Sequence, residues 1–422
     1  MWLVNANVID VVTGERLRGR AVEVARDGTV AQVAVAPPPG LAGAAEADRA
    51  DRADRATGGT AGTAWAAGTD GRGVVDVGGR WLLPGLISCH THLSIVFGEV
   101  DEAESPALTA YRAATRATEA LRAGITTIRC VHEQNRADLL MRTAVEHGWY
   151  AAPRIFGAGR AVSTPGGHGA GGGCAYASGE QEFYEAALAE LAAGADHVKV
   201  FISGGLNRAG EDLWRPEMTD GEIRGAVRAA DEHDSYVVAH SGGTAVIQQA
   251  LRQGVRCFEH IYQLDDETAA LLARPGIFVT PTLCVTRSAG WMRAAGFPES
   301  SIERHLAAGE EHLASVRRAI RAEVTLVNGT DIPPGDPVDG TPAAVYELLM
   351  LAAAGLSPLA ALQTASVNAA GLLGISDRVG QVRPGFAADF VAVDGDPLDD
   401  LAALRTISLV VQGGRVVRDD PR

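Results

Sequence analysis

Two histidines separated by one residue are the feature of this chain whose spacing most directly suggests chemistry. His90 and His92 follow an apolar run at 82–87, which is typical of a buried strand. Side chains two residues apart in a strand point to the same side, so both imidazoles could bind one metal ion. The pair therefore predicts a metal site, provided that further ligands lie nearby in the fold.

Four further polar residues each close an apolar run of their own: Lys199, His240, His260 and Asp331. Burial lowers the pKa of a lysine because it disfavours the ammonium, and a neutral amine at Lys199 could capture CO₂ as a carbamate that bridges two metals. His240 and His260 could bind a second ion, and the Asp331 carboxylate could bind a metal and relay a proton. Each residue alone also has an ordinary interpretation, such as an ion-paired lysine or a helix-capping aspartate. Their shared position at strand ends favours the metal site.

The elements that must position these residues alternate between strand and helix from residue 81 onward. The predicted strands end near His90, Arg129, Phe156, Lys199, His240, His260, Pro281 and Asp331. Capping boxes are expected to open helices at Ser178 and Thr219. Eight strand–helix units predict a (β/α)₈ TIM barrel, in which the chemistry lies at the carboxyl ends of the strands.

The two ends of the chain predict a second, smaller unit. Residues 1–35 and 390–417 contain short alternating strands, and we expect them to pair into one small β-sandwich. The predicted domains are therefore 1–80 and 376–422 for the β-sandwich and 81–375 for the barrel. Residues 42–70 are rich in Ala, Gly, Thr and repeated Ala-Asp-Arg, and we interpret them as a low-complexity surface insertion.

Composition restricts the partners and the compartment. The 422 residues include 37 basic and 52 acidic side chains, a net charge of −15, which argues against nucleic acid or an anionic membrane as a partner. The sequence has no apolar run long enough to span a bilayer and no secretion signal. Five cysteines without a CxxC motif indicate reduced thiols. We expect a cytoplasmic homo-oligomer that acts on a small-molecule substrate.

Several motifs, taken in order, carry a resemblance to a known family. They are LPGLI (83–87), GITTIR (124–129), GAGRAVS (157–163), GGHG (166–169), KVFISGG (199–205), GTD (329–331), TASVNAA (364–370) and GQVRPGFAAD (380–389). With these motifs the chain resembles the amidohydrolase superfamily, in the branch of imidazolonepropionase-like amidohydrolases and metal-dependent prolidases. The resemblance covers nearly the whole chain.

This resemblance implies a binuclear site and a hydrolytic reaction. His90, His92 and Asp331 would hold one ion, His240 and His260 the other, and carbamylated Lys199 (N6-carboxylysine) would bridge them. Zinc is the usual occupant, although Mn, Co or Fe accept the same ligands. The implied reaction is hydrolysis of an amide-like C–N bond, in an N-acyl amino acid, a dipeptide or a cyclic amide, by a metal-bridging hydroxide, with Asp331 as the catalytic proton carrier. Lactone hydrolysis, cyclic imide hydrolysis and deamination at the same site stay open, as does a non-catalytic binding protein.

Four positions depart from the family pattern, and none is a predicted metal ligand. One is Ser241, which follows His240 where the family usually has Ala. Ser88 and Cys130 each stand where the family usually has Asp, and Met218 stands where prolidase-like members often carry a pocket Tyr. The last departure weakens a peptidase interpretation.

Loop and helix residues complete the set of candidates. The resemblance makes His168 a substrate contact, and Arg160 could either bind a substrate carboxylate or pair within its loop. The run 167–172 matches GxGxxG, but it does not join a strand to a helix directly, so we interpret it as a loop over the site. His132 and Glu133 could face the pocket and stay unassigned. Four more histidines are predicted to be solvated on helices: His147, His233, His305 and His312.

Overall fold

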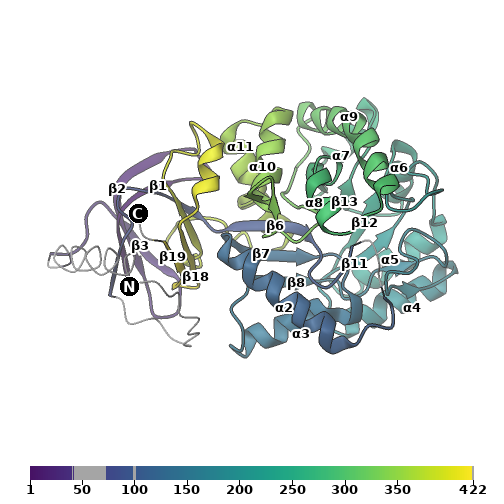
Figure 1. Cartoon of the computed structure of the whole chain (residues 1–422), viewed down its shortest axis with the longest axis horizontal. Coiled ribbons are helices and arrows are strands. Elements are labelled where there is room, and N and C mark those ends of the chain that lie inside the picture. Colours follow the sequence, from purple (N-terminus) through teal and green to yellow (C-terminus); the bar gives the residue numbers. More distant parts are fainter. Residues whose placement is uncertain (40, 42–72, 98–100, 421–422) are drawn as a thin grey trace.

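The computed structural model of the chain has a small β-rich part beside a larger body of strands and helices (Figure 1). It describes residues 1–39, 41, 73–97 and 101–420. The predicted low-complexity insertion at 42–70 lies outside the described residues. In the described part of the chain, no helix combines the length and the apolar character that crossing a bilayer requires.

The small part is one mixed sheet to which both ends of the chain contribute. Within the described residues its order is β19-β18-β17-β5-β1-β2-β3, with β4 paired to β1. The strands are β1 (Trp2–Ile9), β2 (Arg16–Val24), β3 (Val30–Ala34), β4 (Val74–Asp76), β5 (Trp81–Pro84), β17 (Phe390–Val393), β18 (Leu409–Gln412) and β19 (Arg415–Asp419). Hydrogen bonds connect all of these strands in a single sheet, whereas we expected the two sheets of a sandwich. Apolar side chains from both ends, such as Leu3, Val22, Phe390 and Val411, share one core.

The boundary between the two parts differs from the predicted one. β5, which we assigned to the barrel, pairs in parallel with β1 and antiparallel with β17. The chain then passes through Gly85 into β6, the strand that carries the histidine pair. A Cβ at Gly85 would lie 2.3 Å from Thr126 Oγ1, so only glycine fits this close passage.

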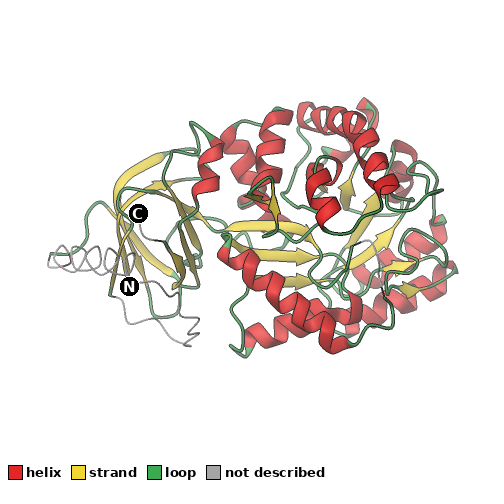
Figure 2. Cartoon of the chain, in the orientation of Figure 1, coloured by secondary structure: helices red, strands yellow, loops and turns green. Residues whose placement is uncertain are grey.

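The larger body contains two parallel sheets covered by helices (Figure 2). Among the described residues their orders are β6-β7-β8 and β10-β9-β11-β12-β13-β14. The strands are β6 (Leu86–Thr91), β7 (Ile125–Cys130), β8 (Arg154–Gly157), β9 (Val162–Ser163), β10 (Ala175–Tyr176), β11 (Val198–Phe201), β12 (Val237–Ser241), β13 (Cys257–His260) and β14 (Phe278–Thr280), and a separate hairpin is made by β15 (Pro337–Val338) and β16 (Thr341–Pro342).

Helices follow most of these strands, as the alternating pattern predicts. They are α2 (Pro106–Arg122), α3 (Ala137–Glu146), α4 (Gly179–Ala192), α5 (Asp220–Asp231), α6 (Thr244–Arg252), α7 (Asp266–Leu272), α8 (Ala289–Ala294), α9 (Glu299–Arg321), α10 (Ala343–Ala354), α11 (Pro358–Thr364) and α12 (Val367–Leu372), with 3₁₀ turns η1 (Gln134–Arg136), η2 (Leu283–Thr286) and η3 (Leu401–Thr406). The capping box at Thr219 is confirmed. The one at Ser178 is wrong: its hydroxyl caps nothing, and Gln181 bonds Glu185 instead.

The predicted eighth strand, which ends at Asp331, is not a regular strand. Its residues 324–331 form only an isolated bridge between Val279 and Leu326. The segment nevertheless forms hydrogen bonds with the strands on both of its sides, β14 and β6. Val327 N donates to Val279 O on β14 (2.9 Å), and Cys89 N on β6 donates to Asn328 O (2.7 Å). It therefore links the edge of one parallel sheet to the edge of the other and carries Asp331 beside β6.

Candidate metal centre and substrate pocket

A cavity of about 380 Å³ lies at the carboxyl ends of β6, β11, β12 and β13. This volume is within the usual range for small-molecule sites. All six predicted metal ligands line it: His90, His92, Lys199, His240, His260 and Asp331. The parallel strands thus bring together residues that are up to 241 positions apart in the chain, counted from His90 to Asp331.

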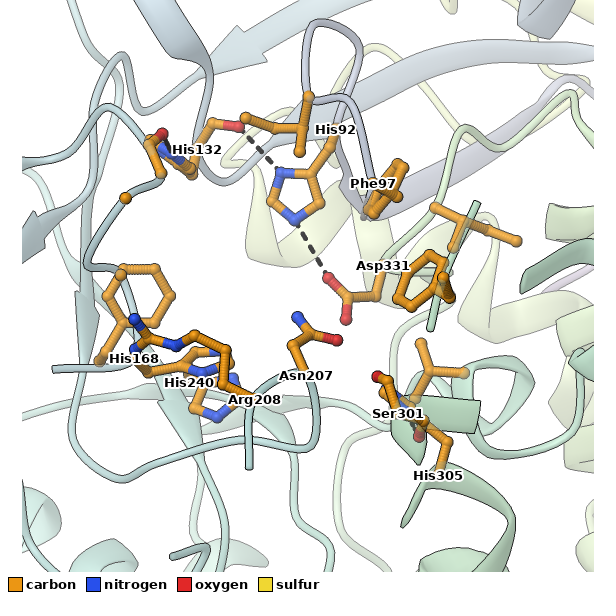
Figure 3. A pocket seen from close by; sticks show the side chains of 18 of the residues that line it. His92, Phe97, His132, His168, Asn207, Arg208, His240, Ser301, His305 and Asp331 are labelled. Carbon is orange, nitrogen blue, oxygen red and sulfur yellow. Dashed lines mark hydrogen bonds and ion pairs between the residues drawn. The ribbon is translucent and has the colours of Figure 1, made fainter. Parts of the chain in front are cut away.

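Two histidines and one carboxylate converge on a single point in this cavity. Asp331 Oδ1 lies 2.8 Å from His90 Nε2 and 3.0 Å from His92 Nε2. Both contacts use the same oxygen, and the other carboxylate oxygen lies on the pocket side (Figure 3). The Asp331 side chain is 27% exposed and His90 is buried, so an ion here would be open to the cavity on one side only.

The hydrogen bonds of the two rings test whether this point suits a cation. His92 Nδ1 lies 2.8 Å from His132 O, and since a carbonyl only accepts, Nδ1 carries the proton. His90 Nδ1 contacts the Glu259 carboxylate, which is likewise an acceptor. Neutral rings of this tautomer direct their Nε2 lone pairs at the carboxylate oxygen of Asp331. Lone pairs that meet in this way require either a protonated ring or a shared cation, so the donor set fits a metal ion.

The remaining candidate ligands lie beside this point. The ring centroids of His240 and His260 are 4.5 Å apart, and those of His90 and His260 are 5.1 Å apart. His240 Nε2 lies 3.1 Å from the Gly204 carbonyl and must donate to it, which leaves Nδ1 as the acceptor nitrogen. Burial lowers the pKa of His240 and of His260, so both favour the neutral form that a metal needs.

Lys199 is buried in the same cavity. Its side chain extends from β11, and Nζ lies 5.4 Å from the centre of the Phe201 ring. Burial lowers the pKa of this lysine, although the negative charges of Glu259 and Asp331 oppose the shift. The environment is the one that the sequence predicts for an amine that reacts as a neutral group.

Three backbone positions around the site are held in the left-handed region. They are His260 (φ 69°), Thr282 (φ 52°) and Asp331 (φ 61°), and Ile261 directly after His260 (φ 52°) is a fourth. Such conformations cost about 1–3 kcal/mol for residues other than glycine and persist only where the surroundings impose them. These strained conformations occur at predicted ligands or next to them. The surrounding structure therefore orients these side chains at a cost in folding stability.

A buried ion pair behind the cavity orients His90. Glu259, next to His260 on β13, contacts His90 Nδ1 and accepts from Arg129 Nη2 at 2.8 Å. Burial alone would raise the pKa of Glu259, but Arg129 and His90 hold it below its usual range. A carboxylate on the far nitrogen of a ligand histidine fixes the ring and raises its basicity. Sequence reasoning did not assign this role to Glu259.

A second positioning network involves α9 and corrects an expectation. His312 is buried, not solvated, and its Nε2 donates to the carbonyls of His260 and Pro281, both at 2.9 Å. Thr282 Oγ1 then lies 2.7 Å from His260 Nδ1. His305, one of the four histidines predicted to be solvated, is also buried and lines the cavity.

The glycine-rich run forms a loop over the cavity, as predicted. His168 lies in this loop, lines the cavity, and stacks on His240 with ring centroids 4.3 Å apart. Its Nδ1 lies 3.0 Å from Glu211, and its ring packs so closely on Gly205 that a Cβ there would lie 2.1 Å away. Arg208 bonds Glu211 and the carbonyls of the loop, so it fastens the loop to the segment after β11.

The remaining sequence candidates lie elsewhere or play other parts. Arg160 does not line the cavity: its guanidinium pairs at 2.8 Å with Glu190 on α4, so its partner is a helix residue, neither a substrate nor a residue of its own loop. His132 does line the cavity, whereas Glu133 accepts bonds from the backbone of 93–94. The departures from the family pattern are all buried, and none lines the cavity: Ser88, Cys130, Met218 and Ser241. Because Met218 packs in the apolar core, its difference from Tyr does not reach this pocket.

Comparisons with known proteins agree with this geometry. The model of the amidohydrolase family matches residues 81–417. Ochratoxinase from Aspergillus niger is 27% identical over 374 residues, which cover 80% of this chain and 75% of that protein. The crystal structure of an amidohydrolase superposes with a TM-score of 0.83 at 28% identity, over 100% of this chain and 99% of that one. A Xaa-Pro dipeptidase with bound methionine, at 22% identity and a TM-score of 0.82 over 99% of each chain, shares the fold.

These matches confirm the resemblance that the motifs carry, since the matched region contains every ligand candidate of the cavity. The chain belongs to the amidohydrolase family.

Proposed function

We propose that this protein is a metal-dependent hydrolase that cleaves an amide-like C–N bond of a small molecule, such as an N-acyl amino acid, a dipeptide or a cyclic amide. The convergence of His90, His92 and Asp331 carries the proposal. Two ring nitrogens and a carboxylate oxygen meet there with their lone pairs directed at one another. Family membership supports the hydrolytic class.

The chain offers ligands for two divalent ions. His90, His92 and Asp331 would hold the first, and His240 and His260 the second, with Lys199 as N6-carboxylysine between them. Zinc suits imidazole and carboxylate donors, and Mn, Co and Fe accept them as well. Bound ions supply Lewis acidity, which activates water and polarises a carbonyl.

The protein's own groups position and move protons around that chemistry. Asp331 keeps one carboxylate oxygen toward the pocket, where it can take a proton from the attacking water and deliver it to the leaving nitrogen. His168 faces the cavity from the opposite loop, and its Nδ1 donates to Glu211, which leaves Nε2 of the neutral ring free to accept a hydrogen bond from a substrate N–H or O–H. His90, Lys199, His240 and His260 are buried at the base of the cavity, and burial strengthens polar interactions there.

We further propose that the part of the chain from the start of β6 to residue 375 forms a closed (β/α)₈ barrel. The bonds of residues 324–328 to both β14 and β6 support closure. In such a barrel the ligands would belong to strands 1, 4, 5, 6 and 8, and the catalytic face would lie at the carboxyl ends.

The compartment and assembly are part of the proposal. The five cysteines are buried and free, which supports a reducing compartment such as the cytoplasm. Exposed apolar side chains on and beside α2 and α3, among them Tyr111, Leu140 and Trp149, support a homo-oligomer. The negative net charge supports a small-molecule substrate over nucleic acid or a membrane.

Metal analysis combined with a substrate panel tests the function. We expect the purified protein to contain up to two divalent ions per chain, to lose hydrolysis of N-acyl amino acids, dipeptides or cyclic amides on dialysis against a chelator, and to regain it with zinc. Hydrolysis that survives complete metal removal would contradict the proposal. Turnover confined to lactones, cyclic imides or amino-substituted rings would instead identify one of the alternative reactions at the same site.

A further inference from the structure

Three aromatic rings form one side of the cavity. Phe97 follows β6, Trp291 lies in α8, and Phe297 lies just beyond α8. The centroid of Phe97 is 5.2 Å from that of Trp291 and 5.8 Å from that of Phe297, and the latter two are 5.9 Å apart. All three side chains are partly exposed and line the cavity. We refer to Phe97, Trp291 and Phe297 as the aromatic wall.

The aromatic wall stands next to the metal ligands and across from the polar loop. The Phe97 ring centroid is 6.2 Å from that of His92. In Figure 3, Phe97 lies on the Asp331 side of the cavity, whereas His168 and Arg208 lie on the other side. The candidate ligands therefore lie between an apolar surface and a polar one, at the place where a scissile bond would sit.

The wall is held in place by groups outside the cavity. Trp291 Nε1 donates to Asp336 at 3.0 Å, and the guanidinium of Arg116 lies 5.9 Å from the centre of the Phe97 ring. Further apolar side chains extend the same surface: Ile95, Val96, Val285, Met292, Pro298 and Ile332. A pre-ordered cluster of partly exposed rings in a concave site is the arrangement that binds large apolar ligand groups, because ordering the rings requires little additional entropy.

We propose that the aromatic wall is the specificity subsite for an aryl or comparably large apolar group of the amide substrate. The inference rests on the proposed function and narrows it, since small acyl amino acids such as N-acetylglycine would leave the wall uncovered. The preferred substrate has its apolar group toward Phe97 and Trp291 and its polar end toward His168.

Binding of simple carboxylates to the metal-loaded protein tests the wall without requiring turnover. Both acetate and phenylacetate carry the same metal-binding group, and only the second carries a ring. We expect titration calorimetry to give phenylacetate at least about tenfold higher affinity than acetate, in line with the burial of one aromatic ring. Trp291→Ala and Phe97→Ala should each reduce that ratio severalfold, whereas Trp149→Ala, an exposed tryptophan beyond α3, should leave it unchanged.

A kinetic comparison identifies which part of the substrate meets the wall. N-phenylacetylglycine and N-acetyl-L-phenylalanine are each compared with N-acetylglycine, and the wall variants should remove the advantage of whichever arylated amide is preferred. Equal affinity for the two carboxylates, or a ratio that both wall variants preserve while remaining folded by thermal denaturation, overturns the inference. Ring-selective binding without hydrolysis of any amide would refute the proposed function alone, and hydrolysis without ring selectivity would refute the wall alone.

Discussion

The two sides of the cavity are built differently. On the strand side, the histidine and lysine ligands extend from buried strands or from the residue that follows one, and Asp331 comes from the irregular segment beside β6. Buried partners such as Glu259, Thr282 and His312 restrain the histidine rings or the backbone that carries them. On the loop side, His168 lies in a glycine-rich run that Arg208 and Glu211 hold through partly exposed contacts. The difference separates two tasks. The strand side is suited to holding charges at fixed positions, and the loop side to accommodating a substrate.

The largest effect is expected at the centre of the strand side. Asp331→Asn keeps one oxygen that can bind a metal but removes the group that carries the proton, so turnover should fall by about 10²–10⁴-fold. The metal content, measured on the same preparation, should remain. A variant that retains its ions and full turnover would exclude the proton role of Asp331. Loss of the ions would show instead that its charge is needed to bind them.

A smaller effect is expected from the partner of His260. Thr282→Val removes the hydroxyl that contacts His260 Nδ1 while conserving side-chain volume. Because partners of this kind orient ligand histidines, metal affinity should fall by about tenfold, measured by competition with a chelator. Thr282→Ser keeps the hydroxyl and serves as the matched control. Equal loss in both variants would attribute the effect to packing and not to the hydrogen bond.

The smallest effect is expected on the loop side and depends on pH. Burial would raise the pKa of Glu211, but His168 and Arg208 lower it to about 2. A carboxyl with a depressed pKa stabilises the folded state above its unfolded pKa of about 4.3, and this contribution is lost as the pH falls toward 2. Glu211→Gln should therefore lower the free energy of unfolding by about 1–2 kcal/mol at pH 7, after allowance for the exposed arginine, and by roughly half as much at pH 3.

Urea denaturation at pH 7 and at pH 3 measures this difference. In the same Glu211→Gln variant, KM should rise because His168 loses the carboxylate that holds it. Glu299→Gln is the matched control, because the Arg293–Glu299 pair is exposed on both sides. A Glu211 variant that behaves like this control at pH 7 would show that the loop side contributes no such stability. The ion pair of the loop would then contribute as little to stability as an exposed surface pair.

The difference between the strand side and the loop side also explains which parts of the site could be predicted from the sequence. The six strand-side ligands were identifiable because each closes an apolar run, and parallel strands bring such ends together. The residues that position these ligands could not be identified in this way. Glu259 has the same sequence context as any buried strand residue, and its contact with His90 joins β13 to β6, two strands of different sheets. His312 left a signal that was overlooked: Ile302, His305, Gly309, His312 and Val316 recur at helical spacing and mark the buried face of α9.

Loop residues were harder to assign because loops have no regular spacing of apolar residues that would indicate which side chains are buried. Arg160 was equally compatible with a substrate or with a local partner, and only the position of Glu190 on α4 decides between these. The aromatic wall comes from segments without a common motif. The eighth strand was predicted from its apolar run, yet residues 324–331 make one isolated bridge and a few single hydrogen bonds to β14 and β6, and they form no regular ladder.

The position of β5 has a consequence for dissecting the molecule. This strand pairs with β1 and β17 and is separated by Gly85 alone from the strand that carries His90 and His92. Excising either terminus would leave β5 with an open edge directly attached to the catalytic body. The terminal sheet therefore cannot be removed without disturbing the larger body. Both ends of the polypeptide help to position His90 and His92.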